Sequence, residues 1–417
     1  MNKNFVAKFT LILLAIVLGA SGGFLGLLYL HLPYNEALEE ETKVYISKNH
    51  TTEISLNNNT ATSAGDIAVH FLELGNKYTG DCTYIKVGED IDILIDCGSR
   101  TSSIAYVKKY LDNYVTDVAD NGKKILDYVI ITHAHRDHYA GFATSAKMQS
   151  IFDLFYCNNI ITFSQTESGK KDTSTYKNFE RELNEVKGYD LENNVEVASN
   201  KFTALDCVEK QNGANDIFVL DQENNVELQI LKTKFYYQAS ENENNNSVCC
   251  MINQGSKNFL FTGDLEGESE QDGEHSLITQ NALPKVELLK AGHHGSKTSS
   301  SSEFLNAVLD PDNPAIVCVC CCAGSTEYTT APQNTFPTKE FIERISQYTT
   351  LVYVTTLCED YKNNKFTSFN GNITILSSGS SALVVKCSNN TDLLKDTNWF
   401  KLNRYDMCYV GMADSWK

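Results

Sequence analysis

Short apolar runs and amphipathic stretches alternate along the chain from about residue 66 onward. Three closely spaced runs between residues 67 and 98, IAVHFLEL, CTYIKV and IDILIDCG, have the length and residue types of β-strands. Their spacing predicts antiparallel neighbours, because antiparallel strands can be joined by short turns. Residues 102–118 carry apolar side chains at helical spacing, which predicts an amphipathic helix.

The same alternation continues through the rest of the chain. Further strands are expected at VELQIL, SVCCMI, NFLFTG, VELLKA, AIVCVC, LVYVTT and NITIL, and helices at KNFERELNEVK, SEFLNAVL and TKEFIERIS. Strands mixed with helices in two halves are typical of an α/β protein built as a layered sandwich on two sheets. We expect this domain to cover residues 65–390. Residues 391–417 carry aromatic side chains without a clear period and are expected to form a C-terminal tail.

The first 64 residues have a different pattern. Residues 9–32 are uncharged and long enough to cross a bilayer as a helix. Lysines precede this span within residues 1–8 and glutamates follow it, which predicts a cytoplasmic N-terminus and a single-pass protein of the cell membrane with an extracellular domain. A cleaved signal peptide is the alternative, although the apolar run continues past the small residues at 19–21. Residues 33–64 are rich in Asn, Thr and Ser and are expected to form a tether.

The chain has thirteen cysteines, an odd number. In an extracellular domain cysteines usually form disulfides. Here many lie inside apolar runs such as AIVCVCCC, where cysteine behaves as a small buried apolar residue. A thiolate metal cluster at residues 318–322 is the alternative, but no second cysteine pair stands at zinc-finger spacing. We therefore interpret the cysteines as core residues.

The sequence HAHRDH at residues 133–138 follows a predicted strand and places three histidines and an aspartate within six positions. Packing does not explain such a group, because each buried side chain would need its own hydrogen-bond partner. Imidazole and carboxylate are ligands that suit divalent ions such as zinc. The motif therefore predicts a metal site.

Two later stretches supply further candidate ligands. Asp264 follows a predicted strand in FLFTGDLEG, and His293 and His294 follow another in LLKAGHHGSK. Binding and catalytic residues often lie on loops at the ends of such strands. We expect these side chains to lie with the HAHRDH motif along one rim of the sandwich.

These motifs, in this order, resemble the metallo-β-lactamase fold superfamily, and within it the hydrolase domain of ComEC-type competence proteins. The resemblance runs from about Asp66 to Cys387 and rests on FLELG, GDCTYIK, ILIDCG, ITHAHRDHYAG, NNNSVCCMI, NFLFTGDLE and LLKAGHHGSKTSSSSEFL. It implies a four-layered αβ/βα sandwich behind the membrane helix, with a two-metal site between the sheets.

The resemblance also implies roles for individual residues. The implied metal ligands are His133 and His135 for one ion, and Asp137, His138, Asp264 and His294 for the other. Asp264 would bridge both ions, and Asp96 would orient ligands rather than bind metal. Asp137, Asp264 and His293 are the residues expected to take part in catalysis. His293 would contact substrate or lie just behind the ligands.

The sequence departs from the family pattern at two places. No histidine lies between His138 and His275, so the first ion lacks a protein ligand that many members provide. Phe336 stands where the ComEC-type pattern tends to carry a histidine, in APQNTFPTKEF. The first departure predicts a weaker first metal site, and the second puts a nuclease activity in doubt.

The expected cofactors are two divalent ions, zinc first and manganese as the alternative. Such ions activate water and neutralise developing charge on oxygen, which predicts a hydrolase acting on phosphodiesters through a metal-bound hydroxide. A hydrolase of another ester or lactone and a non-catalytic binding protein remain alternatives. The expected partners are the membrane and a small-molecule or phosphodiester substrate. The formal charge of −18 disfavours nucleic acid.

Overall fold

The computed structural model describes residues 44–46, 64–143, 149–267, 272–379 and 381–417. The predicted membrane span at 9–32 and most of the predicted tether lie outside these residues. Within the described part of the chain, no helix has both the length and the apolar character needed to cross a bilayer.

The first sheet has nine strands. Its order is β1 (Val44–Ile46), β19 (Val384–Cys387), β18 (Ile373–Ser377), β2 (Ile67–Phe71), β3 (Thr83–Val87), β4 (Ile91–Ile95), β5 (Lys124–Ile131), β6 (Phe155–Thr162) and β9 (Asn200–Thr203). Strands β2, β3 and β4 pair antiparallel, as predicted. Strand β5 pairs parallel to β4 after the crossover helix α4 (Ile104–Tyr114). Strand β1 falls inside the predicted tether and pairs with β19.

The second sheet has eight strands. Its order is β10 (Ile217–Asp221), β11 (Val226–Leu231), β12 (Cys249–Gln254), β13 (Lys257–Phe261), β14 (Leu288–Lys290), β15 (Ile316–Ala323), β16 (Val352–Asp360) and β17 (Lys365–Ser368). Strands β13 to β16 run parallel, so their carboxyl ends lie at one edge of the sheet. A separate hairpin is formed by β7 (Lys187–Asp190) and β8 (Val195–Ala198).

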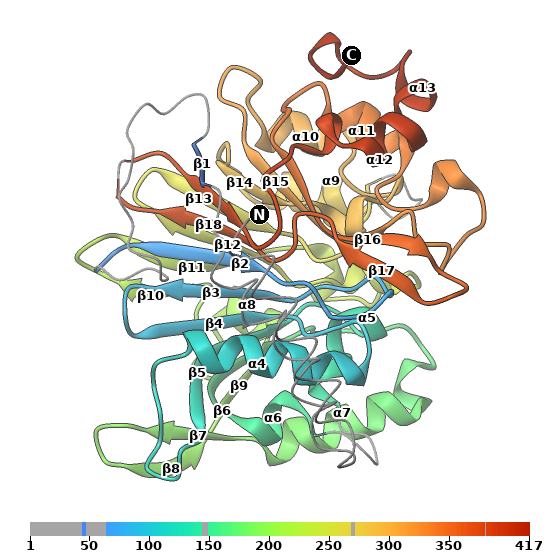
Figure 1. The fold of residues 1–417 in the computed structure, drawn as a ribbon. Helices are drawn as coiled ribbons and strands as arrows, with labels where there is room; N and C mark the ends of the chain where they lie inside the picture. Colours follow the sequence, from blue (N-terminus) through green and yellow to red (C-terminus); the bar gives the residue numbers. More distant parts are fainter. Residues whose placement is uncertain (1–43, 47–63, 144–148, 268–271, 380) are drawn as a thin grey trace, which may run out of the picture. The chain divides into compact units, whose positions relative to one another are not determined.

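The two sheets pack face to face, and helices cover their outer faces (Figure 1). The remaining helices are α5 (Arg136–Tyr139), α6 (Ile151–Leu154), α7 (Ser174–Glu185), α8 (Ala204–Glu209), α9 (Gly273–Gln280), α10 (Ser302–Val308), α11 (Lys339–Ile345), α12 (Asn398–Asn403) and α13 (Tyr405–Cys408). In β2, the ring of Phe71 contacts Phe261 of the second sheet, whereas the neighbouring His70 contacts Tyr110 and Tyr114 of α4. This order of helix, sheet and sheet, with α9 to α13 on the far side, is consistent with the expected αβ/βα sandwich.

Strand β15 shows why cysteine suits this architecture. Cys318 and Cys320 join the core between the sheets, whereas Cys321 joins the core under helices α9 to α13. All thirteen cysteines lie in the described residues, twelve of them are buried, and all are free. Burial raises the pKa of thiols such as Cys207, to about 12. Because these side chains point to opposite faces of one strand, they do not form a thiolate cluster, and the interpretation as core residues agrees with the structure.

The C-terminal residues pack against the second sheet. Phe400 and Trp416 are buried in its helix-covered core, and the indole Nε1 of Trp416 donates to the carbonyl of Thr349 at 2.9 Å. The buried guanidinium of Arg404 donates to the carbonyls of Thr335 and Pro337 at 2.8 and 3.0 Å. Residues 391–417 therefore contact the domain, whose expected limits at 65 and 390 stay a prediction.

Candidate metal centre

Strand ends from both sheets bring the predicted site residues together. The HAHRDH motif follows β5, Asp96 follows β4, Asp264 follows β13, and the two neighbouring histidines follow β14. Strands β4 and β5 are parallel to each other, as are β13 and β14, so each pair ends at one edge of its sheet. The loops that leave these edges meet where the two sheets face each other.

Asp264 lies at the centre of this group. Four imidazole nitrogens approach its Oδ2 atom: Nε2 of His138 at 3.1 Å, of His294 at 3.4 Å, of His293 at 3.9 Å and of His133 at 4.0 Å. The backbone N–H of Asp264 donates to the hydroxyl of Ser247 at 3.1 Å and fixes the turn. The carboxylate is 1% exposed, so the protein rather than water determines its surroundings.

Asp96 orients His138. Its Oδ2 lies 2.8 Å from His138 Nδ1, which turns His138 Nε2 toward Asp264. The backbone N–H and the hydroxyl of Thr132 donate to the two oxygens of Asp96 at 2.8 and 2.7 Å. Asp96 itself has a φ of 57°, a conformation that Asp adopts more readily than most residues. Asp96 thus contacts a predicted ligand, and its role in orienting that ligand stays a prediction.

His294 is held in a similar way. Its Nδ1 lies 2.9 Å from the carbonyl of Cys320 and 3.2 Å from Asp81 Oδ1, while its Nε2 faces Asp264. His293 and His294 both have a positive φ, 47° and 56°. Such backbone is uncommon for non-glycine residues and occurs often at functional sites.

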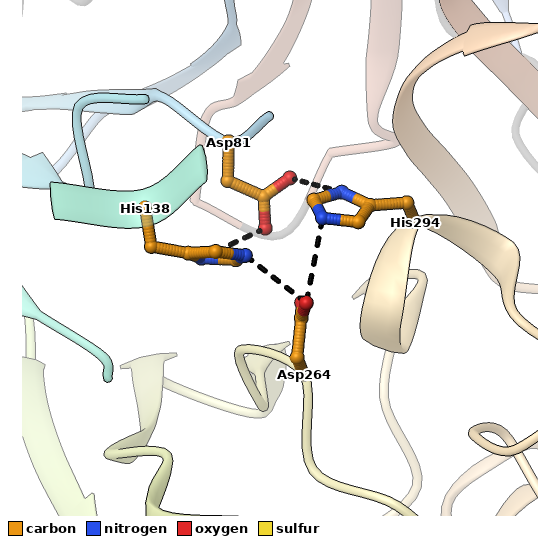
Figure 2. Close-up of side chains that lie close together, drawn as sticks. All are labelled: Asp81, His138, Asp264 and His294. Carbon is orange, nitrogen blue, oxygen red and sulfur yellow. Dashed lines mark ion pairs between the residues drawn. The ribbon is translucent and has the colours of Figure 1, made fainter. Parts of the chain in front are cut away.

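Asp81 is a member of the site that the sequence did not identify. One ligand atom each from Asp81, His138, Asp264 and His294 lies within 4.8 Å of all the others, and all four side chains are buried. Figure 2 shows the four side chains pointing toward one another. Asp81 precedes β3 in the sequence GDC, and its backbone N–H donates to the carbonyl of Asp137 at 2.9 Å. The signal available in the sequence was an acidic residue at the start of a buried strand.

Asp137 lies at the edge of this group. Its Oδ2 is 3.5 Å from His294 Nε2, and the same oxygen accepts a hydrogen bond from the hydroxyl of Tyr328 at 2.7 Å. Asp137 was expected among the ligands of the second ion, yet the compact group of four contains Asp81 instead. Asp137 is therefore close enough to His294 to belong to the site, and it lies on the solvent side of the group.

His133 and His135 form a pair beside the group of four. His133 Nε2 lies 3.0 Å from His135 Nδ1, and the other nitrogen of His133 lies 3.1 Å from the hydroxyl of Thr132 and 3.4 Å from that of Ser247. His133 is fully buried. The structure thus places these two imidazoles together, and their role as ligands of one ion stays a prediction.

His293 faces the accessible side of the centre. Its Nδ1 lies 3.2 Å from Glu266 Oε1 and 3.2 Å from the hydroxyl of Thr298, and the side chain is 20% exposed. The ring of Phe336 lies 5.9 Å from that of His293 and 5.7 Å from that of His294. Phe336 therefore lies at the site, where the family pattern led us to expect a histidine.

The electrostatics of the centre favour bound positive charge. Burial disfavours the ionised form of Asp264, but the neighbouring imidazoles of His138 and His294 outweigh it and hold the pKa of this carboxyl well below its usual range. Burial also opposes the imidazolium of His138, yet Asp264 and Asp96 outweigh it and raise the pKa of His138. By contrast, burial and the neighbouring imidazoles lower the pKa of His133. Cations are therefore stabilised most strongly between Asp264, His138 and His294.

The residues fit a divalent metal ion. Among the described residues, three buried polar atoms of the group have no hydrogen-bond partner: Nε2 of His138, Nε2 of His294 and Oδ1 of Asp264. Unpaired buried polar groups are costly, and a cation would satisfy them. Imidazole nitrogen with carboxylate oxygen is a ligand set used by zinc and by neighbouring divalent ions. A second group, formed by Asp272, His275 and Glu303, is mostly exposed and contains a surface ion pair.

A family model described as the metallo-beta-lactamase superfamily matches residues 75–147. This segment contains Asp81, Asp96 and the whole HAHRDH motif. Residues 75–147 are therefore similar to the metallo-β-lactamase superfamily, whose members are generally hydrolases, and the resemblance seen in the motifs is confirmed over this segment.

Two curated proteins are similar to part of this chain. Recombination protein 2 of Haemophilus influenzae is 39% identical over 70 residues, which are 17% of this chain and 8% of that protein. ComE operon protein 3 of Bacillus subtilis is 36% identical over 85 residues, which are 19% of this chain and 10% of that protein. Both are ComEC-type competence proteins, as the resemblance predicted. The match spans about a tenth of the length of these relatives.

Among solved structures, unliganded yeast PDE1 is 10% identical, and the match covers 71% of this chain and 90% of that chain with a TM-score of 0.33. A score of this size supports no assignment of function.

Proposed function

We propose that this protein is a metal-dependent hydrolase whose centre is built around Asp264. The observation that carries the proposal is the approach of four histidine Nε2 atoms to a single buried carboxylate oxygen, at 3.1 to 4.0 Å. A structural aspartate needs one or two partners, and this arrangement leaves several buried atoms unpaired. Divalent ions at such a centre lower the pKa of a coordinated water and neutralise charge on substrate oxygens.

The residues of the chain divide into three roles. Asp264, His138 and His294 hold the metal, with His133 and His135 beside them for a second ion. Asp96 keeps Nδ1 of His138 occupied, so that the opposite nitrogen is free to bind. His293 is partly exposed and is placed to contact substrate, with Glu266 behind its Nδ1.

We propose a phosphodiester as the substrate. Negative charge develops on phosphoryl oxygens during hydrolysis, and paired cations stabilise that charge. The charge of −18 argues against a long polyanion, so a small phosphodiester fits this chain better than nucleic acid. The aromatic ring of Phe336 beside His293 and His294 also gives this side of the site an apolar wall.

A hydrolase assay on the purified full-length chain tests the proposal. We expect at least one equivalent of zinc or manganese and turnover of bis-p-nitrophenyl phosphate, with a lactone and nitrocefin as competing substrates. The matched control is Asp264→Asn. Less than one equivalent of bound metal would contradict the proposed enzyme activity and favour a non-catalytic binding protein. Turnover of the lactone alone would show that the substrate is a lactone and not a phosphodiester.

We also propose that the domain lies outside the cell, behind a membrane helix at residues 9–32. The support is the apolar length of this segment, with lysines before it and glutamates after it. Protease added to intact cells should then remove the domain. Protection until the cells are lysed would reverse the orientation.

A further inference from the structure

Lys290, the last residue of β14, is a buried cation at the metal centre. Its side chain is 3% exposed, and its Nζ lies 2.5 Å from Asp81 Oδ2. The same ammonium lies 3.1 Å from the carbonyl of Ala291 and 3.4 Å from that of Gly263. Burying an ammonium group is costly unless it is paired, so the contact with Asp81 accounts for its position. Neither Lys290 nor Asp81 was identified from the sequence.

The second oxygen of Asp81 faces His294. Asp81 Oδ1 lies 3.2 Å from His294 Nδ1, and the carbonyl of Cys320 lies 2.9 Å from the same nitrogen. Both neighbours of Nδ1 are acceptors, so in a neutral imidazole the hydrogen resides on Nδ1. The lone pair is then on Nε2, the nitrogen that faces Asp264.

The same relationship occurs on the other side of the centre. Asp96 contacts His138 Nδ1, and His138 Nε2 faces Asp264. Each of the two histidines thus has a carboxylate behind it. The two carboxylates differ in their support, since Asp96 accepts from the backbone and hydroxyl of Thr132, whereas Asp81 is paired with the ammonium of Lys290.

We propose that Asp81 is a positioning residue that orients His294 rather than a metal ligand, and that Lys290 holds it in this role. Asp81 is close enough to the other three side chains to bind an ion with them. With Lys290 at one oxygen and His294 at the other, its carboxylate is kept behind the imidazole. The inference rests on the proposed function only in that His294 must bind metal.

Cobalt(II) loaded into the full-length protein tests this assignment, because its visible absorption depends on the number and type of ligands. In Asp81→Asn, we expect the wild-type band position to be kept and the affinity to fall about 10–100-fold, as for other residues behind a metal ligand. In Lys290→Gln, the freed Asp81 carboxylate can reach the ion, so we expect the band to change. The double variant should return to the spectrum of Asp81→Asn.

The control is Lys285→Gln. Lys285 is an exposed lysine on the approach to the same strand, and its Nζ donates to the carbonyls of Asn306 and Leu309. Its loss should leave the cobalt spectrum unchanged. Circular dichroism establishes that each variant folds, and if Lys290→Gln does not fold, the Asp81→Asn spectrum decides alone.

Two results would overturn the assignment. A band shift in Asp81→Asn typical of a lost ligand, with an affinity loss well beyond 100-fold, would make Asp81 a ligand. An unchanged spectrum in folded Lys290→Gln would remove the role of Lys290. Failure of the wild-type protein to bind cobalt would refute the metal centre itself, whereas binding without hydrolysis would refute only the proposed activity.

Discussion

The hydroxyl of Tyr328 donates a hydrogen bond to Asp137 Oδ2 at 2.7 Å, although the tyrosine side chain is 57% exposed. Tyr328 lies on the loop that follows β15, and its neighbour Glu327 pairs with Arg100 at 2.6 Å. The loop therefore reaches from the second sheet to the HAHRDH motif on the first. It brings an aromatic side chain and its hydroxyl to the accessible side of the centre.

Tyr328→Phe removes this hydrogen bond and keeps the ring. Because the side chain is mostly exposed, we expect the thermal stability to change little. Turnover should fall by roughly 3–30-fold, since a hydrogen bond to a charged group contributes about 1.5–3 kcal/mol at most and Asp137 keeps its other contacts. Steady-state kinetics on bis-p-nitrophenyl phosphate measure the effect. Unchanged turnover would show that the hydroxyl has no part in arranging the site.

Asp264→Asn is expected to have the largest effect of any single change. It keeps the size of the side chain but removes the charge that faces four imidazoles, so cations are held less strongly. We expect hydrolysis to fall by about 10² or more and the metal content to fall with it. Metal analysis and turnover on one preparation check both.

The comparison for this variant is Asp96→Asn, which acts only through the orientation of His138. Turnover of Asp96→Asn should fall by only about 10–100-fold. If Asp264→Asn kept near-normal activity with its metal bound, the centre would have to be rebuilt around other residues.

Stepwise chelation should release two ions at different rates. His138, Asp264 and His294 offer converging buried atoms, whereas His133 and His135 lack a third protein histidine. We expect the ion at His133 and His135 to leave first under increasing chelator concentration. His135→Ala should then remove the labile ion and leave the retained one. Loss of both ions together in the wild-type protein would contradict this order.

A carboxyl group far from the metal should make stability depend on pH. Burial raises the pKa of Asp127, on β5, to about 7, and its Oδ2 accepts from the backbone N–H of Asp92 at 2.9 Å. A raised carboxyl pKa stabilises the fold fully below the unfolded value near 4, and this contribution is lost as the pH rises from about 4 to about 7. Asp127→Asn should remove that part of the pH dependence, on the order of 1–2 kcal/mol for a half-buried group.

Denaturant unfolding at pH 4.5 and 7.5 measures this effect. Asn in place of Asp127 keeps an oxygen to accept the hydrogen bond, so only the titration is lost. The control is Glu223→Gln, at an exposed turn, which should keep the wild-type pH dependence. If the free energy of unfolding depended on pH equally in Asp127→Asn and in the wild-type protein, the carboxyl group of Asp127 would not control that dependence.

The strands and the ligand motifs could be predicted because their signals are local. The apolar runs at residues 67–98 became β2, β3 and β4, and the HAHRDH motif is contained in six residues. Asp81 and Lys290 could not be predicted in this way, because they are 209 positions apart and only the packing of the two sheets pairs them. Helices α12 and α13 are 6 and 4 residues long, too short to show a helical period.

The buried guanidinium of Arg404 connects the C-terminal residues to the accessible side of the candidate metal centre. It donates hydrogen bonds to the carbonyls of Thr335 and Pro337, the two residues on either side of Phe336. The ring of Phe336 in turn lies beside the rings of His293 and His294. Proteolytic clipping ahead of Arg404 would remove these hydrogen bonds together with the buried Trp416, although every proposed ligand would stay in the chain. We expect a chain trimmed in this way to hold the ring of Phe336 less firmly beside His293 and His294, and so to lose part of the aromatic surface at the accessible side of the centre.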